Sequence, residues 1–292
     1  MSISPVTLPR SVNLVHVRAP QVDRSDPGTR ECVSRLHTLR DAAQWQSVVL
    51  ALMLTPSNRR GHSKWLDQWY ELPGAARLLD DTLTLPQACR LPLFEHFARL
   101  LAPGPVELRQ QLISAARQLM TADGAVTPLD QLRWVALRHM LAGSAAAAPA
   151  AAEADLHDID DAQALKVCVF SAFLSHMVPA PELTLDLTGL ESIGETWFHT
   201  VVAPWYQRFT LPPREHRDID ATLRALRVLQ EMPWMLRPVL VRTWFEAACE
   251  LTDGPALHPV AADALRLTCT LLDSPVPPEL GRQYIEVEPA RH

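Results

Sequence analysis

A turn sequence between two apolar stretches constrains the fold of this chain more than any other feature. Residues 121–130 read TADGAVTPLD. Asp123 and Gly124 form a common turn pair, because glycine adopts positive φ without steric cost. Thr127 then precedes a proline, and Asp130 follows three residues later, which is a helix capping box with an acidic variation. The pattern predicts a helix, a tight turn and a second helix in direct succession.

A looser copy of this turn occurs in the second half of the chain. Residues 252–260 read TDGPALHPV, with a loop one residue longer than in the first copy. Asp253 and Gly254 form the turn pair, and His258 before a proline marks the next helix start. The two copies predict a tandem of helical modules.

Apolar residues recur at helical spacing along most of the chain. Val48, Val49 and Leu52 follow Trp45 at spacings of three, four and seven, which places them on one helix face. An earlier helix face carries Cys32, Leu36 and Leu39. Further helices are expected at about residues 62–72, 86–102, 105–121, 128–142, 158–178, 190–209, 217–231, 233–251 and 259–273. These patterns predict an all-α fold.

Composition divides the chain into an arm, two helical subdomains, a linker and a tail. Residues 1–28 hold four prolines without a sustained helical period, and we expect an extended arm. Residues 143–152 are rich in alanine and lack large apolar side chains, which predicts a linker at 144–156. The helical subdomains are expected at 29–143 and 157–276, with a proline-rich tail at 277–292.

Charge and hydropathy exclude several classes of protein. The net charge is −6, and no cluster of basic residues could neutralise phosphates, so we expect no nucleic-acid partner. No apolar run approaches the ~20 residues that span a bilayer, and we expect no signal peptide, since the first residues lack a basic start and an apolar segment. The five cysteines are widely spaced without a CxxC pair, which is typical of reduced thiols. We expect a cytoplasmic protein that does not insert into membranes.

Motifs that specify a reaction are missing. A zinc peptidase needs His-Glu-x-x-His on one helix face, and the nearest fragment, Glu95-His96, has the reverse order. The ten glycines are too scattered for a phosphate-binding loop, and no Gly-x-Ser-x-Gly elbow occurs. We therefore expect neither catalysis nor a cofactor.

Two pairs of residues are candidates for binding. Asp123 and Asp130 are carboxylates on one turn that could hold a divalent cation, although a turn and a helix cap explain both without a metal. Trp65 and Trp69 lie four residues apart on one helix face. Such a pair is either part of the core or an exposed aromatic groove for a partner helix or peptide.

The turn resembles a recurring phrase of TerB-like domains, which are helical modules named for tellurite resistance. The phrase is an Ala-Asp-Gly turn with an acid seven residues after its Asp, and Asp123 and Asp130 match it. The order of elements over about residues 30–280 is similar to the soluble C-terminal region of bacterial HtpX-like membrane zinc peptidases. There, as at residues 90–93, RLPL precedes a helix, and a terminal phrase resembles LDSPVPP at 272–278, with Ser274 in place of cysteine.

The resemblance implies two stacked TerB-like subdomains but no peptidase activity. The membrane helices and the zinc motif of those peptidases are absent from this sequence. The second turn has Val260 or Ala261 where an acid is expected, and Asp263 follows further along the helix. We expect a non-catalytic interaction or regulatory module with a protein partner, such as an accessory subunit of a bacterial membrane protein. The alternative is a hydrolase-related or divalent-metal-binding protein with an unrecognised site.

Overall fold

A computed structural model describes residues 26–143, 156, 159–181, 192–205, 208–210, 219–252 and 254–286. Helices and turns make up these residues, and they contain no strand, so the prediction of an all-α protein is confirmed. The predicted extended arm lies outside the described residues up to position 25, as does most of the predicted alanine-rich linker. Among the described helices, none combines the length and apolar character that crossing a bilayer requires.

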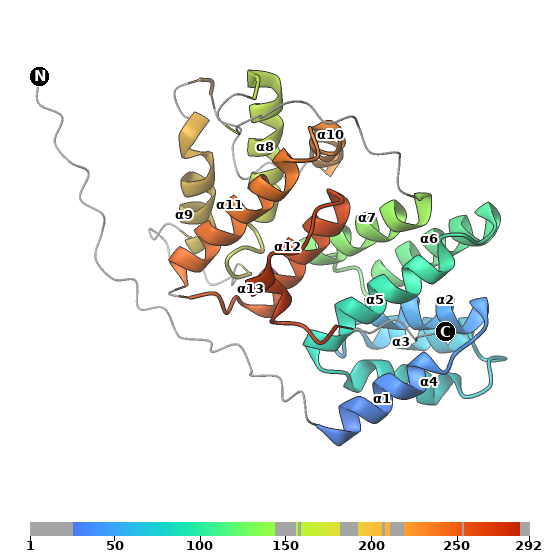
Figure 1. Ribbon diagram of the computed structural model, residues 1–292. Helices are drawn as coiled ribbons and strands as arrows, with labels where there is room; N and C mark the ends of the chain where they lie inside the picture. The colour runs from blue at the N-terminus through green and yellow to red at the C-terminus, as the bar shows by residue number, and fades with distance from the viewer. Residues whose placement is uncertain are drawn as a thin grey trace, which may run out of the picture.

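The first half of the chain forms a helical bundle in which α2 and α5 pack closely together (Figure 1). Its helices are α1 (Pro27–His37), α2 (Ala42–Met53), α3 (Arg59–Gln68), α4 (Ala75–Thr84), α5 (Gln87–Leu101), α6 (Val106–Met120) and α7 (Pro128–Ala142). Helix α2 is buried from Ser47 to its end at Met53 because α4, α5 and α6 pack around it. An apolar run that is buried on all sides explains why α2 shows little amphipathic character.

The second half contains α8 (Asp161–Leu174), α9 (Ile193–Val202), the 3-10 turn η2 (Ala203–Trp205), α10 (Ile219–Glu231), α11 (Leu236–Leu251), α12 (Pro259–Leu271) and the short α13 (Pro278–Gly281). Helix α8 packs against α10, and α11 packs against α9 and α12. Two buried tryptophans anchor this core. The indole nitrogen of Trp197 donates to the Trp244 carbonyl at 3.1 Å, and that of Trp244 donates to Ser171 Oγ at 2.9 Å.

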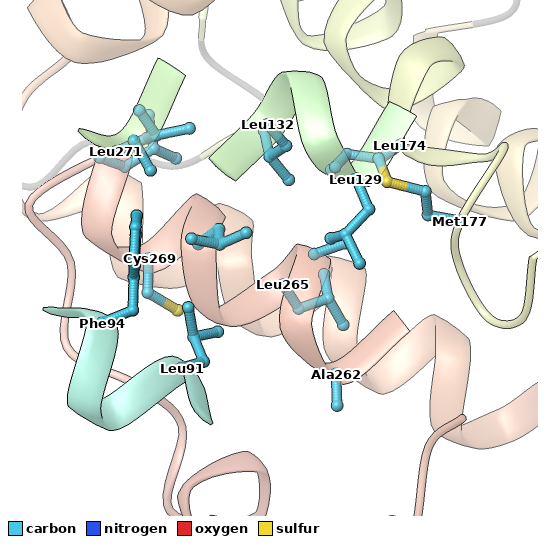
Figure 2. Packing of buried hydrophobic residues seen from close by; sticks show 14 of the residues in the cluster. Leu91, Phe94, Leu129, Leu132, Leu174, Met177, Ala262, Leu265, Cys269 and Leu271 are labelled. Atoms are coloured by element: carbon cyan, nitrogen blue, oxygen red, sulfur yellow. The ribbon is translucent and has the colours of Figure 1, made fainter. Parts of the chain in front are cut away.

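The helices that follow the two turns meet at the centre of the molecule. Helix α7 follows α6 and the first turn, whereas α12 follows α11 and the second, and α7 and α12 lie side by side (Figure 1). Figure 2 shows Leu129 and Leu132 of α7 beside Leu265 of α12, with Leu91 of α5 near Cys269. The buried apolar residues of both halves therefore form one continuous core.

The first turn has the predicted geometry. Gly124 has a φ of +80°, in the left-handed region that favours glycine. Thr127 Oγ1 accepts from the Asp130 backbone N–H at 3.2 Å, and the Asp130 carboxylate accepts from the Thr127 backbone N–H at 3.1 Å. The predicted capping box is therefore confirmed. At the second turn His258 caps α12, because its Nδ1 accepts from the Val260 N–H at 3.2 Å.

Two elements differ from the sequence prediction. Helix α4 was not predicted, although Leu78, Leu79 and Leu83 have the required spacing and Gly74 at φ +78° begins it. The proline-rich tail predicted at 277–292 is wrong for its described part, because Leu280 is fully buried and Tyr284 nearly so. The apolar side chains of this segment pack into the core despite the prolines around them.

Candidate functional site

The tryptophans proposed for partner binding do not form an exposed groove. Trp65 is fully buried, and its indole N–H donates to the Ser47 carbonyl of α2 at 3.0 Å. Trp69 is half-buried and packs against the same core. The prediction of an exposed surface at Trp65 is therefore wrong, because α3 turns this face toward α2. The other alternative, that the pair is part of the core, applies.

The two aspartates of the first turn are engaged with the backbone. Asp123 Oδ1 accepts from the Ala125 N–H at 3.1 Å, and Asp130 belongs to the capping box. In the part of the chain that the structure describes, no group of three or more His, Cys, Asp or Glu side chains could hold a metal ion. The turn geometry accounts for both carboxylates as structural residues.

The cysteines are poor nucleophiles. All are free, and only Cys249 is partly exposed. Burial raises the pKa of Cys168 and of Cys269 to about 12, and that of Cys32 to about 11. The reactive form of a cysteine is its thiolate. These thiols therefore stay protonated at neutral pH and act as small core residues.

A histidine–aspartate pair lies where the halves meet, but its hydrogen bonds prevent base catalysis. His139 Nε2 lies 3.1 Å from Asp273 Oδ1, and its Nδ1 lies 3.2 Å from Gln230 Nε2. The same amide nitrogen donates to the Leu271 carbonyl at 2.8 Å. Since an amide nitrogen can only donate, Nδ1 accepts and Nε2–H donates to Asp273. Neither ring nitrogen is left to take a proton from a substrate.

A buried ionic cluster joins the two halves, and we call it the junction. Asp263 of α12 is 1% exposed and accepts from Arg133 of α7 at 2.8 Å, Gln87 of α5 at 2.5 Å and the Tyr284 hydroxyl at 3.0 Å. Burial raises the pKa of Asp263, while the charge and hydrogen bond of Arg133 act against that rise. A buried carboxylate is stable only with such partners.

Arg266 forms the second part of the junction. Its guanidinium bonds Glu95 of α5 at 2.8 Å and Glu286 at 2.5 Å, and Thr270 Oγ1 donates to Glu95 at 2.8 Å. Burial acts to lower the pKa of Arg266, but the hydrogen bonds of Glu286 and Glu95 outweigh it and raise the pKa. Arg, Gln, Thr and Tyr donors thus occupy the carboxylates of the junction. This arrangement ties helices together and holds no group poised for proton transfer.

A second candidate lies on the surface of the first half, and we call it the α5–α6 groove. It is a cavity of about 260 Å³ between the start of α2, the end of α5 and the start of α6. Its lining is mostly apolar and includes Trp45, Leu100, Leu101, Leu108 and Leu112. Leu100 and Leu108 are each 38% exposed, and the neighbouring Val106 is 47% exposed.

Local sequence explains why this groove stays open. Pro103 and Pro105 flank Gly104, whose N–H donates to the Leu101 carbonyl at 3.0 Å and turns the chain sharply after α5. The guanidinium of Arg109 donates to the Leu141 carbonyl, which holds the start of α6 against the end of α7. The indole N–H of Trp45 donates to the Leu39 carbonyl at 3.2 Å and fixes the ring at the groove.

Sequence reasoning missed both the junction and the groove. Arg133, Asp263 and Arg266 are charged residues within apolar helical stretches, which is a signal of buried ion pairs, but the sequence does not show which charges meet. The PGP loop at 103–105 between leucine-rich helices marks the groove.

Comparison with known proteins does not assign the chain to a family. No family model matches it, and neither does any curated protein or solved structure. The resemblance to TerB-like domains therefore stays a prediction that depends on the residues quoted above. Function must be inferred from the geometry of the groove and the junction.

Proposed function

We propose that this protein is a non-catalytic interaction module that binds a protein partner through the α5–α6 groove. One observation carries the proposal. Leu100 and Leu108 are large apolar side chains that stay exposed at the rim of a mostly apolar cavity. Apolar side chains grouped around a hollow are typical of interaction sites, whereas isolated ones are common on any surface.

The shape of the groove indicates the chemistry of its partner. Two helix ends and a short loop border a cavity of about 260 Å³, which is room for a few apolar side chains. Amphipathic helices bind such grooves with anchors spaced three or four residues apart. We infer that the partner presents a helix or short segment with leucine-like or aromatic anchors.

The wider role rests on the resemblance to TerB-like domains. Two stacked TerB-like subdomains are supported by the equivalent places of α7 and α12, each of which follows a turn that contains an Asp-Gly pair in the sequence. The similarity to the soluble region of HtpX-like peptidases supports a role as an accessory subunit beside a bacterial membrane protein, on its cytoplasmic side.

A matched pair of variants tests the groove. Leu108→Glu places a charge in the groove, whereas Leu66→Glu places one on α3 at a side chain with the same 38% exposure. The wild-type chain should capture partner proteins from the source cells. These proteins should bind Leu108→Glu about tenfold more weakly, since loss of a central anchor costs about 1–2 kcal/mol or more. Capture by Leu66→Glu should be unchanged. Equal capture by both variants would exclude the groove as the binding site.

The alternative, a hydrolase, is tested separately. The purified chain should leave casein uncleaved, with and without added zinc, because neither His139 nor the cysteines offer a free base or thiolate. Chelator-sensitive cleavage would contradict the non-catalytic proposal.

A further inference from the structure

Two histidines from different helices lie next to each other where α1 packs on α5. His37 lies in the last turn of α1, and His96 lies in α5 between the buried residues Glu95 and Phe97. Their ring centroids are 5.3 Å apart, and the ring planes are tilted by 38°. Both side chains are half-buried, so solvent reaches the pair. Neither histidine belongs to the α5–α6 groove or to the junction, and the function proposed above does not use them.

The ring nitrogens of this pair are open. His62, His139 and His258 each use a ring nitrogen in a hydrogen bond to a backbone or side-chain group. In the described part of the chain neither His37 nor His96 has such a bond, and none of their nitrogens is shut off from solvent. An imidazole nitrogen that carries no proton can bind a metal ion. The pair therefore offers two ligands that no other part of the described structure uses.

The helices that carry the pair are firmly held. Arg35, two residues before His37, bonds the Asp81 carboxylate of α4 through two guanidinium nitrogens at 2.6 and 3.1 Å. The Cys32 thiol donates to the Asp81 carbonyl at 3.3 Å, and Leu36 is buried. Helix α5 is buried on both sides of His96. Ligands on two fixed helices keep their separation, which is what a metal site requires.

The separation of the rings matches that of two imidazoles on one metal ion. A histidine nitrogen binds zinc at about 2.0–2.1 Å, and a tetrahedral ion then holds two ring centroids about 5 Å apart. The centroids of His37 and His96 are 5.3 Å apart. The last side-chain torsion of histidine is broad, so each ring can turn one nitrogen toward a shared ion without a change in the backbone.

The composition of the pair selects the class of metal. Imidazole suits zinc, nickel and copper, whereas calcium and magnesium prefer oxygen ligands. No third His, Cys, Asp or Glu side chain joins the pair among the described residues, so water completes the coordination. Arg99 lies three residues after His96, but its side chain is 65% exposed and lies 3.6 Å from Glu95. Solvent therefore screens its repulsion of a bound ion.

We propose that His37 and His96 form a binding site for one zinc, nickel or copper ion, with water in the remaining positions. The bound ion links the end of α1 to α5. Two protein ligands hold it less tightly than the three or four of ordinary zinc sites. A chain prepared without added metal therefore carries none, and EDTA alone leaves such a chain unchanged.

Thermal unfolding of the full chain with nickel as the probe tests the site. When nickel is about 100-fold above its dissociation constant, the melting temperature of the wild type should rise by roughly 5 °C or more, because the ion binds the folded chain. Magnesium should cause no rise. The double variant His37→Gln, His96→Gln should lose the nickel effect. The matched control His62→Gln changes a half-buried histidine that has a hydrogen bond, and it should keep the effect.

Copper identifies the ligands directly, even where a variant changes the stability. The electron paramagnetic resonance spectrum of one equivalent of copper on the wild type should show two imidazole nitrogens. The single variants His37→Gln and His96→Gln should each show one fewer. Metal bound by other histidines of the chain is the same in the wild type and in the double variant. Equal nickel effects in these two proteins, or no nickel effect in the wild type, would overturn the proposal.

Discussion

Helices α7 and α12 follow turns of similar sequence, yet their acids have different roles. Asp130 lies in the first turn of α7, stays partly exposed and bonds only to Thr127, three residues away. Asp263 is the fifth residue of α12, whereas Asp130 is the third of α7; Asp263 is buried and bonds to residues 130 and 176 positions away. A shift of two residues along the helix thus replaces a local cap with a connection between the two halves. Sequence position on a helix does not by itself tell which role an acid has.

The largest expected effect concerns the buried acid. Asp263→Ala removes the acceptor of Arg133, Gln87 and Tyr284 and leaves a buried cation unpaired. The free energy of unfolding should fall by about 3–5 kcal/mol, as is usual when one partner of a buried pair is removed. Urea denaturation measures this. If the free energy of unfolding fell by less than about 1 kcal/mol, water would have to reach the junction. Asp263 would then be no more important for stability than Asp130.

The capping box of α7 should contribute less to the free energy of unfolding than Asp263 does. Thr127→Ala removes the acceptor of the Asp130 N–H at the start of α7 and should cost about 1 kcal/mol. Thr127→Ser keeps the hydroxyl and serves as the control. The same urea denaturation applies to both variants. A loss as large as that of Asp263→Ala would mean that the turn supports tertiary contacts as well as the cap.

The start of α12 should depend on pH, whereas the start of α7 should not. Burial lowers the pKa of His258, so the folded chain takes up its proton less readily than the unfolded chain. The stability that neutral His258 contributes is fully present above its pKa in the unfolded chain, which is about 6.5. This stability is lost as the pH falls toward the lower pKa that His258 has in the folded chain. Protonation also removes the lone pair that accepts from Val260.

The variant His258→Asn isolates this effect, because asparagine caps a helix without titrating in this range. Between pH 7 and pH 5 the wild type should lose roughly 0.5 kcal/mol more than the variant. Other half-buried histidines, His37 and His96, titrate equally in both proteins and cancel. Identical pH profiles for the two proteins would show that His258 does not cap α12 in solution.

The smallest expected effect is that of metal removal. Asp123 and Asp130 are both engaged with the backbone, so EDTA should leave the melting temperature unchanged and added calcium or magnesium should not raise it. Differential scanning fluorimetry measures both. Destabilisation by EDTA that a divalent metal reverses would assign a cation to the first turn.

Local features of the fold were predictable and distant ones were not. The turn at Gly124 and the cap at Thr127 depend on residues within a few positions, and both were predicted. Trp65 illustrates the limit, since helical spacing shows that it shares a face with Trp69 but not what that face contacts. Helix α4 was missed although its leucine spacing was visible, whereas the burial of Tyr284 needed the position of Asp263.

The amino-acid sequence by itself determined that this protein is helical, where its capped turn lies and which helix faces are apolar. These properties follow from backbone conformation and from side chains three or four residues apart. Only the tertiary structure decided which charges pair, because Glu95 and Arg266 are 171 positions apart and meet only after α5 and α12 have packed. It also decided that the segment after α12 lies in the core. A proline in α5 leaves one carbonyl free, and nothing in the sequence indicates that the N–H of Ile285 is the group that reaches it.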